Sequence, residues 1–173
     1  MLRGERVVLR PFRPEDVEPL WRAKLDPLKW AQTTAQPLHP VTLAEHQARY
    51  AEPGTTSMAQ FAVDVDDVLV GRALLFHVDD LARSAEVGLA LLPEHQGQGL
   101  GKDVLRVLLG YGFRSRNLHR LHLQTLSSNE AGLRCYRAVG FVEEGRLREA
   151  AWVEGGYEDM VLMSVLRSEW SGA

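Results

Sequence analysis

SAEVGLALLPEHQGQGLGKDVLRVLL, residues 84–109, is the stretch that decides the fold. It reads as an extended run over residues 84–92, a turn over 93–98 and a helix over 99–109. The turn and the helix start hold glycines at alternate positions, which are Gly97, Gly99 and Gly101. A missing Cβ at every second residue lets the backbone approach a ligand closely. The helix start adds unpaired N–H groups and a positive dipole end, so the stretch predicts a phosphate or pyrophosphate site.

Three phosphate-binding patterns compete for this turn. The dinucleotide fingerprint G-x-G-x-x-G, begun at Gly97, requires a third glycine where Lys102 stands. A P-loop requires glycine in place of Gln96, and serine or threonine in place of Asp103. The pattern that remains is Q-x-x-G-x-G over residues 96–101. An ordinary glycine-rich turn that caps a helix is the alternative.

Length and composition favour one soluble domain spanning residues 1–173. Hydrophobic residues make up 45% and charged residues 25%, as in ordinary globular proteins, and the net charge of −3 gives no basic footprint for nucleic acid. No apolar run is long enough to span a membrane, and the first five residues do not form a signal peptide. The single cysteine, Cys135, excludes an internal disulfide and a cysteine zinc cluster. We expect a cytoplasmic protein without a metal site.

The hydrophobic pattern predicts strands and helices along most of the chain. The expected strands are residues 6–10, 60–65, 69–78, 84–92, 121–126, 142–152 and 157–166. The expected helices are residues 14–24, 42–50, 99–109 and 129–139. Residues 25–41 read as an irregular connection in which Trp30 and His39 are partly buried. Strand, helix and strand over 84–126 imply a parallel pair with a right-handed crossover. The fold class is therefore α/β (α+β), with a mixed, mostly antiparallel twisted sheet and flanking helices.

Local features refine three of these elements. Thr42 with Glu45 forms a capping-box pattern at the start of the second helix. Gly110 and Gly112 are expected to weaken the end of the third helix. In the strand over 84–92, small residues at 88 and 90 share a face with Glu86, which indicates that something lies against that face.

A second motif makes the first one more specific. After Q-x-x-G-x-G comes N-x(6)-Y-x(3)-G-F, which is Asn129, Tyr136, Gly140 and Phe141. The order and separation of the two motifs resemble the GNAT superfamily of N-acetyltransferases. The ending, residues 144–150 and 157–163, and the opening, residues 9–12, are similar to the branch that contains the ribosomal-protein-alanine acetyltransferases. The resemblance covers nearly the whole chain and is weakest over residues 25–60.

This resemblance implies a GNAT-like fold with a splayed opening between the strands at 84–92 and 121–126, and acetyl-CoA as co-substrate. The backbone of the turn would hold the pyrophosphate, the strand would pair with the pantetheine arm, and Asn129 would contact that arm. The turn residues are Gln96, Gly97, Gln98, Gly99, Leu100, Gly101 and Lys102, and the strand residues are Val87, Leu89 and Leu91.

The resemblance also implies the catalytic candidates. Tyr136 would lie near the thioester sulfur and protonate the departing thiolate; the alternative is a packed tyrosine on a helix face. Glu86 would draw off the amine proton; the alternative is a structural or substrate-binding carboxylate. Glu149 and Glu158 are weaker candidates, and Cys135 fits a small apolar role. Some members of the branch have serine where Gly132 stands and glutamate where Ala151 stands, so a serine–glutamate mechanism does not carry over.

The acceptor follows from amine chemistry and the ending of the chain. A protein α-amino group has a pKa of about 7.7–8.0, whereas a lysine amine has one of about 10.4, so an α-amine needs little help to become neutral. We therefore expect direct attack on the thioester by a protein N-terminal α-amine, with a ribosomal protein as candidate. A polyamine or antibiotic acetyltransferase and a non-catalytic CoA-binding sensor remain alternatives. The expected partners are acetyl-CoA and the amine, without nucleic acid or membrane, and a homodimer is compatible with the sequence.

Overall fold

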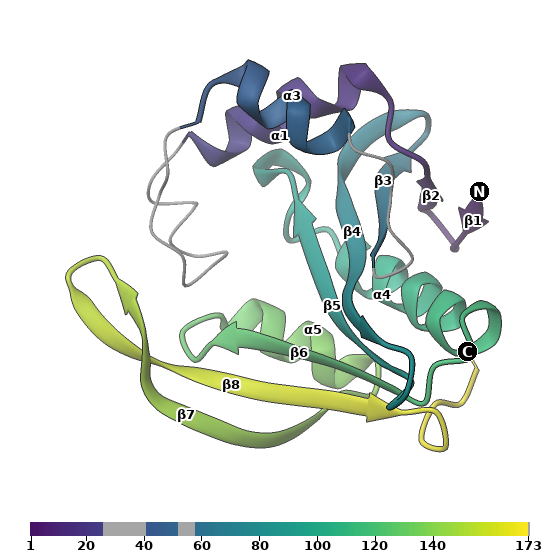
Figure 1. The fold of residues 1–173 in the computed structure, drawn as a ribbon, viewed down its shortest axis with the longest axis vertical. Coiled ribbons are helices and arrows are strands. Elements are labelled where there is room, and N and C mark those ends of the chain that lie inside the picture. The colour runs from purple at the N-terminus through teal and green to yellow at the C-terminus, as the bar shows by residue number, and fades with distance from the viewer. Residues whose placement is uncertain (26–40, 52–57, 173) are drawn as a thin grey trace.

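A single sheet runs through the computed structural model, which describes residues 1–25, 41–51 and 58–172 (Figure 1). Its strands are β1 (Leu2–Arg3), β2 (Val8–Arg10), β3 (Ala59–Val65), β4 (Val68–Asp79), β5 (Ser84–Leu91), β6 (Arg120–Leu126), β7 (Val142–Val153) and β8 (Gly156–Leu166). Their order in the sheet is β1-β2-β3-β4-β5-β6-β8-β7. All neighbouring strands are antiparallel except β5 and β6, which are parallel.

The parallel pair is short, and β5 and β6 diverge beyond it (Figure 1). β6 pairs with β5 only at Ser84, Ala85 and Glu86. On its other edge, β5 pairs with β4 as far as Leu91. Residues 87–91 of β5 therefore have a paired edge toward β4 and, among the described residues, a free edge toward β6. This confirms the predicted parallel pair and the splay between the two strands.

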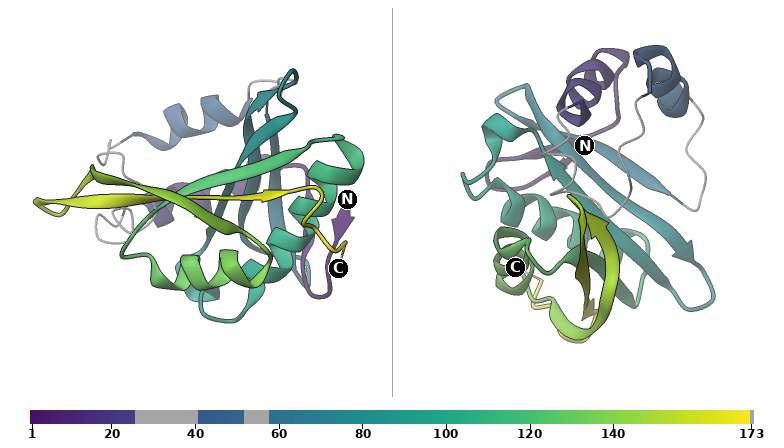
Figure 2. Two further views of the ribbon diagram at one scale, coloured as in Figure 1. Left: turned by 90° about the horizontal axis from the view of Figure 1, so that it is seen from below. Right: turned by 90° about the vertical axis from the view of Figure 1, so that its left-hand side faces the viewer.

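Helices cover both faces of the sheet. They are α1 (Val17–Lys24), which follows a 3-10 turn at Pro14–Asp16, α3 (Leu43–Ala51), α4 (Leu100–Gly110) and α5 (Glu130–Ala138). Figure 2 shows α1 and α3 together on one side and α4 and α5 on the other. The apolar stripe of α4 packs onto the sheet, and Leu105, Leu108 and Phe113 are fully buried there. The predicted mixed, mostly antiparallel architecture is confirmed.

Most predicted element boundaries agree with the structure to within one or two residues. The capping box is present: the Thr42 N–H donates to Glu45 at 2.7 Å, and the Glu45 N–H donates to the Thr42 hydroxyl at 3.2 Å. The predicted strand at 6–10 begins only at Val8, and the short β1 before it had not been predicted. Trp30 and His39 lie outside the described residues.

Glycines at two places in the fold allow close packing. α4 ends at Gly110 and continues as a π-helical turn at Tyr111–Ser115, which agrees with the predicted weakening of the helix end at Gly110 and Gly112. A Cβ on Gly112 would lie 2.8 Å from Leu121, so this glycine allows the helix to approach β6 closely. Near Glu86, the face containing Gly88 is covered by the protein itself: a Cβ there would lie 2.9 Å from Leu74 and 3.3 Å from Phe76.

Candidate active site

The turn between β5 and α4 is shaped by two glycines with left-handed backbone. Gly97 has φ of 73° and Gly99 has φ of 79°, a region that side chains with a Cβ rarely adopt. A Cβ at either position would meet nothing within 4 Å, so both glycines face open space. Gly101 differs, because its Cβ would lie 3.2 Å from Cys135 Sγ. The first two glycines therefore shape and open the turn, and the third allows close helix packing.

Backbone N–H groups gather at this turn. Gly99 is the N-cap of α4, and within the described residues no acceptor faces the N–H groups of residues 98–101. The turn is held in place from its other side: Gln96 donates its side-chain amide to the Leu91 carbonyl at 3.1 Å, and Gln98 donates to the Glu94 carbonyl at 3.0 Å. Four consecutive donors at a helix N-terminus form a concentrated positive end suited to an anion.

Asp103, in the first turn of α4, ties this site to the beginning of the chain. Its buried carboxylate accepts from the backbone N–H groups of Glu5, Arg6 and Val7 at 3.0, 2.7 and 3.0 Å. The Arg6 guanidinium also donates to the carbonyl of Gln98 at 3.0 Å. The turn over residues 4–7 thus braces the helix and the glycine turn together. In the sequence, Asp103 was noted only because it stands where the P-loop pattern requires serine or threonine.

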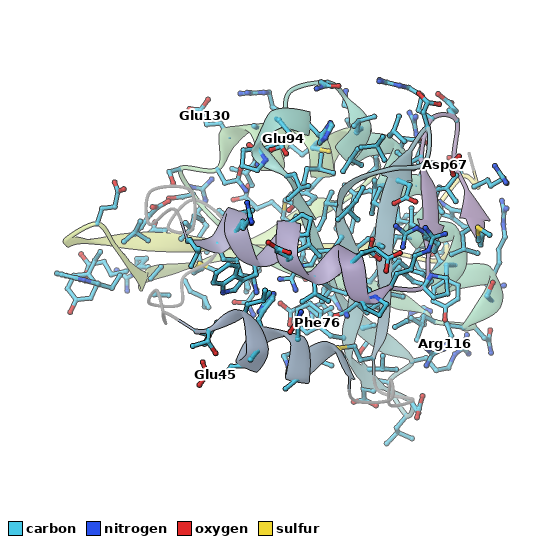
Figure 3. The ribbon with its side chains drawn as sticks, turned by 90° about the horizontal axis from the view of Figure 1, so that it is seen from above. Glu45, Asp67, Phe76, Glu94, Arg116 and Glu130 are labelled. Atoms are coloured by element: carbon cyan, nitrogen blue, oxygen red, sulfur yellow. The ribbon has the colours of Figure 1, made fainter. Side chains whose placement is uncertain are left out.

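α5 packs beside the same turn. Cys135 of α5 and Leu89 of β5 both lie against Gly101, where a Cβ would be 3.2 Å and 3.6 Å from them, so α5 and the free half of β5 both approach the start of α4. Figure 3 shows Glu94, just before the turn, and Glu130, the first residue of α5, on the same side of the molecule. Burial raises the pKa of the Cys135 thiol, which fits the apolar role expected for it.

Asn129 begins α5 as its N-cap, as predicted. Its side-chain oxygen accepts from the Gly132 N–H at 3.0 Å, and its amide donates to the Thr125 hydroxyl at 2.9 Å. A Cβ on Gly132 would lie 2.4 Å from the Asn129 amide nitrogen, so glycine at 132 allows this cap to close. The side chain therefore fixes the start of α5, and its predicted contact with a cofactor stays a prediction.

Tyr136 follows Cys135 on α5 and packs at the core edge. Its ring contacts Phe141 edge-on with centroids 5.9 Å apart, and within the described residues its hydroxyl has no hydrogen-bond partner. Burial raises the pKa of Tyr136 to about 12. The phenol therefore stays protonated at every pH at which the protein would work, and it can donate a hydrogen bond.

Glu86 is the last residue of β5 that pairs with β6, so it lies where the strands part. Only 17% of its side chain is exposed, and one carboxylate oxygen contacts Nδ1 of His77 at 3.0 Å. Its register partner on β6 is His122. Because register partners on adjacent strands share a face, Glu86 and His122 are neighbours. Burial is the main cause that lowers the pKa of His122, and the Glu86 carboxylate partly opposes it.

An ion pair lies next to these residues on the same face. Arg120 binds both oxygens of Glu144 and donates to the hydroxyl of Ser164 at 2.9 Å, and Ser164 is the register partner of His122 on β8. Chiefly through the Arg120 hydrogen bond, the pKa of Glu144 falls to about 2. Glu144 is therefore ionised and committed to Arg120, and it does not compete for a proton.

The two weaker carboxylate candidates lie elsewhere. Glu158 accepts from the Ser128 N–H at 2.5 Å and the Ser127 hydroxyl at 3.2 Å, so it supports the end of β6. Glu149 sits at a bulge of β7, beside an open hollow of about 670 Å³ that Arg146, Leu147, Arg148 and Asp159 also line. The structure thus separates them from Glu86, and it adds His77 and His122, which sequence reasoning had missed. The alternation of His122 with apolar residues was visible, but its register partner was not.

In the part of the chain that the structure describes, no helix is long and apolar enough to cross a membrane. No group of His, Cys, Asp and Glu residues in that part is arranged to hold a metal ion.

Relatives among known proteins share both sequence and fold. A spermidine N(1)-acetyltransferase of Vibrio cholerae is 35% identical over 107 residues, which cover 62% of each chain. A putative ribosomal N-acetyltransferase, YdaF, of Bacillus subtilis is 33% identical over 62% of this chain and 58% of its own. The aligned part therefore spans less than two thirds of these curated relatives.

Solved structures extend the likeness to the whole chain. A crystal structure of the Vibrio cholerae spermidine N-acetyltransferase in complex with CoA and spermine superposes with a TM-score of 0.85 at 25% identity. The match covers 96% of this chain and 98% of that one. A family model described as an acetyltransferase (GNAT) domain matches residues 6–142. The resemblance found in the sequence is thereby confirmed, and the chain belongs to the GNAT acetyltransferase family.

Proposed function

We propose that the protein transfers an acetyl group from acetyl-CoA to a primary amine of a small polycation such as a polyamine. One observation supports this reaction: among the described residues, β5 has a free edge at residues 87–91, with the glycine turn beyond its Leu91 end and the Glu86 carboxylate at its other end. The N–H groups of residues 98–101 in that turn have no acceptor among the described residues. Residues 87–91 span about 13 Å at 3.3 Å per step, which suits an extended arm bearing amide groups. The free edge of β5 would thus connect the proposed phosphate-binding turn with the proposed acid–base site at Glu86.

The donor would bind chiefly through the backbone. The N–H groups of residues 98–101 would hold the pyrophosphate, with Lys102 adding a positive charge nearby. Gly97 and Gly99 leave room for the phosphates, since a Cβ at either position would stand in open space. The free backbone of Val87, Leu89 and Leu91 would pair with the pantetheine amides, much as an added strand pairs with a sheet edge. These residues fit the co-substrate that the family uses.

The catalytic roles follow from charge and burial. Glu86 would attract the ammonium form of the acceptor and assist removal of its proton. The neutral amine would attack the thioester carbon, so that a C–N bond forms and the C–S bond breaks. Tyr136 would donate a hydrogen bond to the departing thiolate. A thiol has a pKa of about 8.5, below that of Tyr136, so complete proton transfer from the phenol is uphill and hydrogen bonding is its main contribution.

The acceptor proposed here differs from the protein α-amine expected from the sequence. Support for a polyamine comes from the spermidine acetyltransferases of Vibrio cholerae and Escherichia coli, which are 35% and 30% identical over the aligned parts. It also comes from the carboxylate of Glu86 where β5 and β6 part, which suits a cationic acceptor. A protein α-amine remains the second candidate, favoured by the 33% identity to the putative ribosomal N-acetyltransferase.

A panel assay tests the proposal. Release of CoA thiol from acetyl-CoA is measured with spermidine, spermine, an aminoglycoside and short peptides that carry free N-termini. We expect spermidine or spermine to have the highest kcat/KM. Preference for a peptide would replace the acceptor and keep the chemistry. CoA binding without thiol release on any amine would instead support a sensor and overturn the enzyme.

A further inference from the structure

Two titratable side chains, Glu86 and His122, lie where β5 and β6 diverge. Glu86 and His122 occupy register-matched positions on the same face, on strands about 4.8 Å apart. They are the last matched pair before the strands diverge, so both side chains stand at the Glu86 end of the free edge. His122 is only partly buried, which leaves its imidazole accessible to a small substrate or a water molecule.

We propose that His122 accepts the proton that the acceptor amine loses, and that Glu86 stabilises the imidazolium that forms. The inference rests on the proposed acetyl transfer. The ammonium gives one proton to the neutral imidazole, directly or through a water, and its nitrogen keeps the electron pair that attacks the thioester. The imidazolium then passes the proton to solvent or to the released thiolate, which returns His122 to its neutral form.

Chemistry favours the imidazole over the carboxylate as the acceptor. A primary amine has a pKa of about 10.4, and the ordinary values are about 6.5 for histidine and 4.3 for glutamate. With these ordinary values, transfer to imidazole is about a hundredfold less unfavourable than transfer to a carboxylate, and the lowered pKa of His122 reduces that margin. One Glu86 oxygen is already engaged by His77, whereas His122 has no hydrogen-bond partner among the described residues.

The surroundings of His122 keep its imidazole neutral before the reaction. The charged groups around it are Glu86 on β5, His77 on β4, Arg120 on β6 and Glu144 on β7. Burial, together with Arg120 and His77, lowers the pKa of His122, and the two carboxylates oppose this without cancelling it. Since Glu144 is bound by Arg120, Glu86 is the carboxylate left to stabilise an imidazolium. His119, an exposed histidine just before β6 and outside the candidate site, serves as a matched control.

The test compares pH–rate profiles of wild type, His122→Gln and His119→Gln with the best amine of the panel. In wild type, kcat/KM should rise through a midpoint below pH 6.5 and then level off, because burial lowers the pKa of the base. His122→Gln should lose about a hundredfold near pH 7 and then climb about tenfold per pH unit toward the pKa of the amine, because only amine that is already neutral can react. His119→Gln should keep the wild-type profile within about threefold.

Each outcome decides between the proposals. A His122→Gln profile parallel to wild type, or the same climb in His119→Gln, overturns the role of His122 and leaves acetyl transfer intact. Absence of thiol release by wild type with every amine overturns the proposed function and this inference with it. CoA binding by calorimetry checks that each variant is folded. If His122→Gln does not fold, His122→Ala is assayed with added imidazole: restored activity supports the base, and unchanged activity overturns it.

Discussion

The two ends of the free β5 edge are built from different groups. At the Leu91 end, the candidate site consists of backbone N–H groups on residues 98–101, exposed by Gly97 and Gly99. At the Glu86 end it consists of side chains from separate strands, among them His122 and His77. A backbone site tolerates varied side chains as long as its conformation survives. A side-chain site changes its chemistry with each substitution, so the donor end suits a constant co-substrate and the other end a variable acceptor.

The largest effect should come from a side chain placed in the backbone site. Gly99→Glu would put a negative charge beside the pyrophosphate, and unit charges about 4 Å apart repel by about 4 kcal/mol near a protein surface. We expect CoA affinity to fall by about 10²–10³-fold in calorimetry. Gly155→Glu is the matched control, because Gly155 also has positive φ, 88°, and open space, but lies in the β7–β8 turn. Equal CoA binding by the two variants would remove the pyrophosphate site from this turn.

A smaller effect is expected from Tyr136→Phe, which tests whether the Tyr136 hydroxyl donates a hydrogen bond to the departing thiolate. The ring that packs on Phe141 is kept and only the hydroxyl is lost. We expect kcat to fall about a hundredfold while the KM for acetyl-CoA stays within about threefold, since the hydroxyl acts only as the C–S bond breaks. Tyr157→Phe is the control, because that tyrosine is 68% exposed on the β7–β8 hairpin. A variant with wild-type kcat would show that Tyr136 is only a packing residue.

The smallest effect is expected where the Asp103 carboxylate binds the backbone N–H groups of residues 5–7. Asp103→Asn leaves one carbonyl oxygen for three backbone N–H groups that now share a carboxylate. Hydrogen bonds to charged groups contribute about 1.5–3 kcal/mol, so the free energy of unfolding should drop by about 2 kcal/mol in urea denaturation. CoA affinity should fall severalfold, because Arg6 then holds Gln98 less firmly.

Asp67→Asn, in the β3–β4 turn, serves as its control and should stay within about 0.5 kcal/mol of wild type. Unchanged stability in Asp103→Asn would mean that the turn over residues 4–7 does not depend on the carboxylate charge.

The same contrast explains what could be predicted from the sequence. Gly97, Gly99 and the Asn129 cap act within a few residues of themselves, so their roles could be predicted from local spacing. The alternation of strands predicted the sheet, and the order of elements predicted the parallel pair. These features together sufficed for the fold and for the backbone conformation of the glycine turn.

What escaped prediction depends on distant partners. The proposed role of His122 depends on its register with Glu86, 36 positions earlier, and no local sequence pattern predicts that register. Gly112 predicted only a weaker helix end, because its close neighbour Leu121 lies across the helix–sheet contact. Asp103 reads as an ordinary acid near a helix start until the backbone of residues 5–7 is placed around it.

The hydrogen bonds between Asp103 and residues 5–7 also have a consequence for the order in which parts of the chain fold. These contacts join residues 96 to 98 positions apart, so they close one of the longest loops in the molecule. Until residue 103 has been synthesised, the N–H groups of residues 5–7 have no carboxylate to bind, and the opening strands have nothing to fix them against α4. Contacts of such separation form slowly, because loop closure precedes any gain from them. The glycine turn at residues 96–101 should therefore become rigid late, when residues 5–7 bind Asp103.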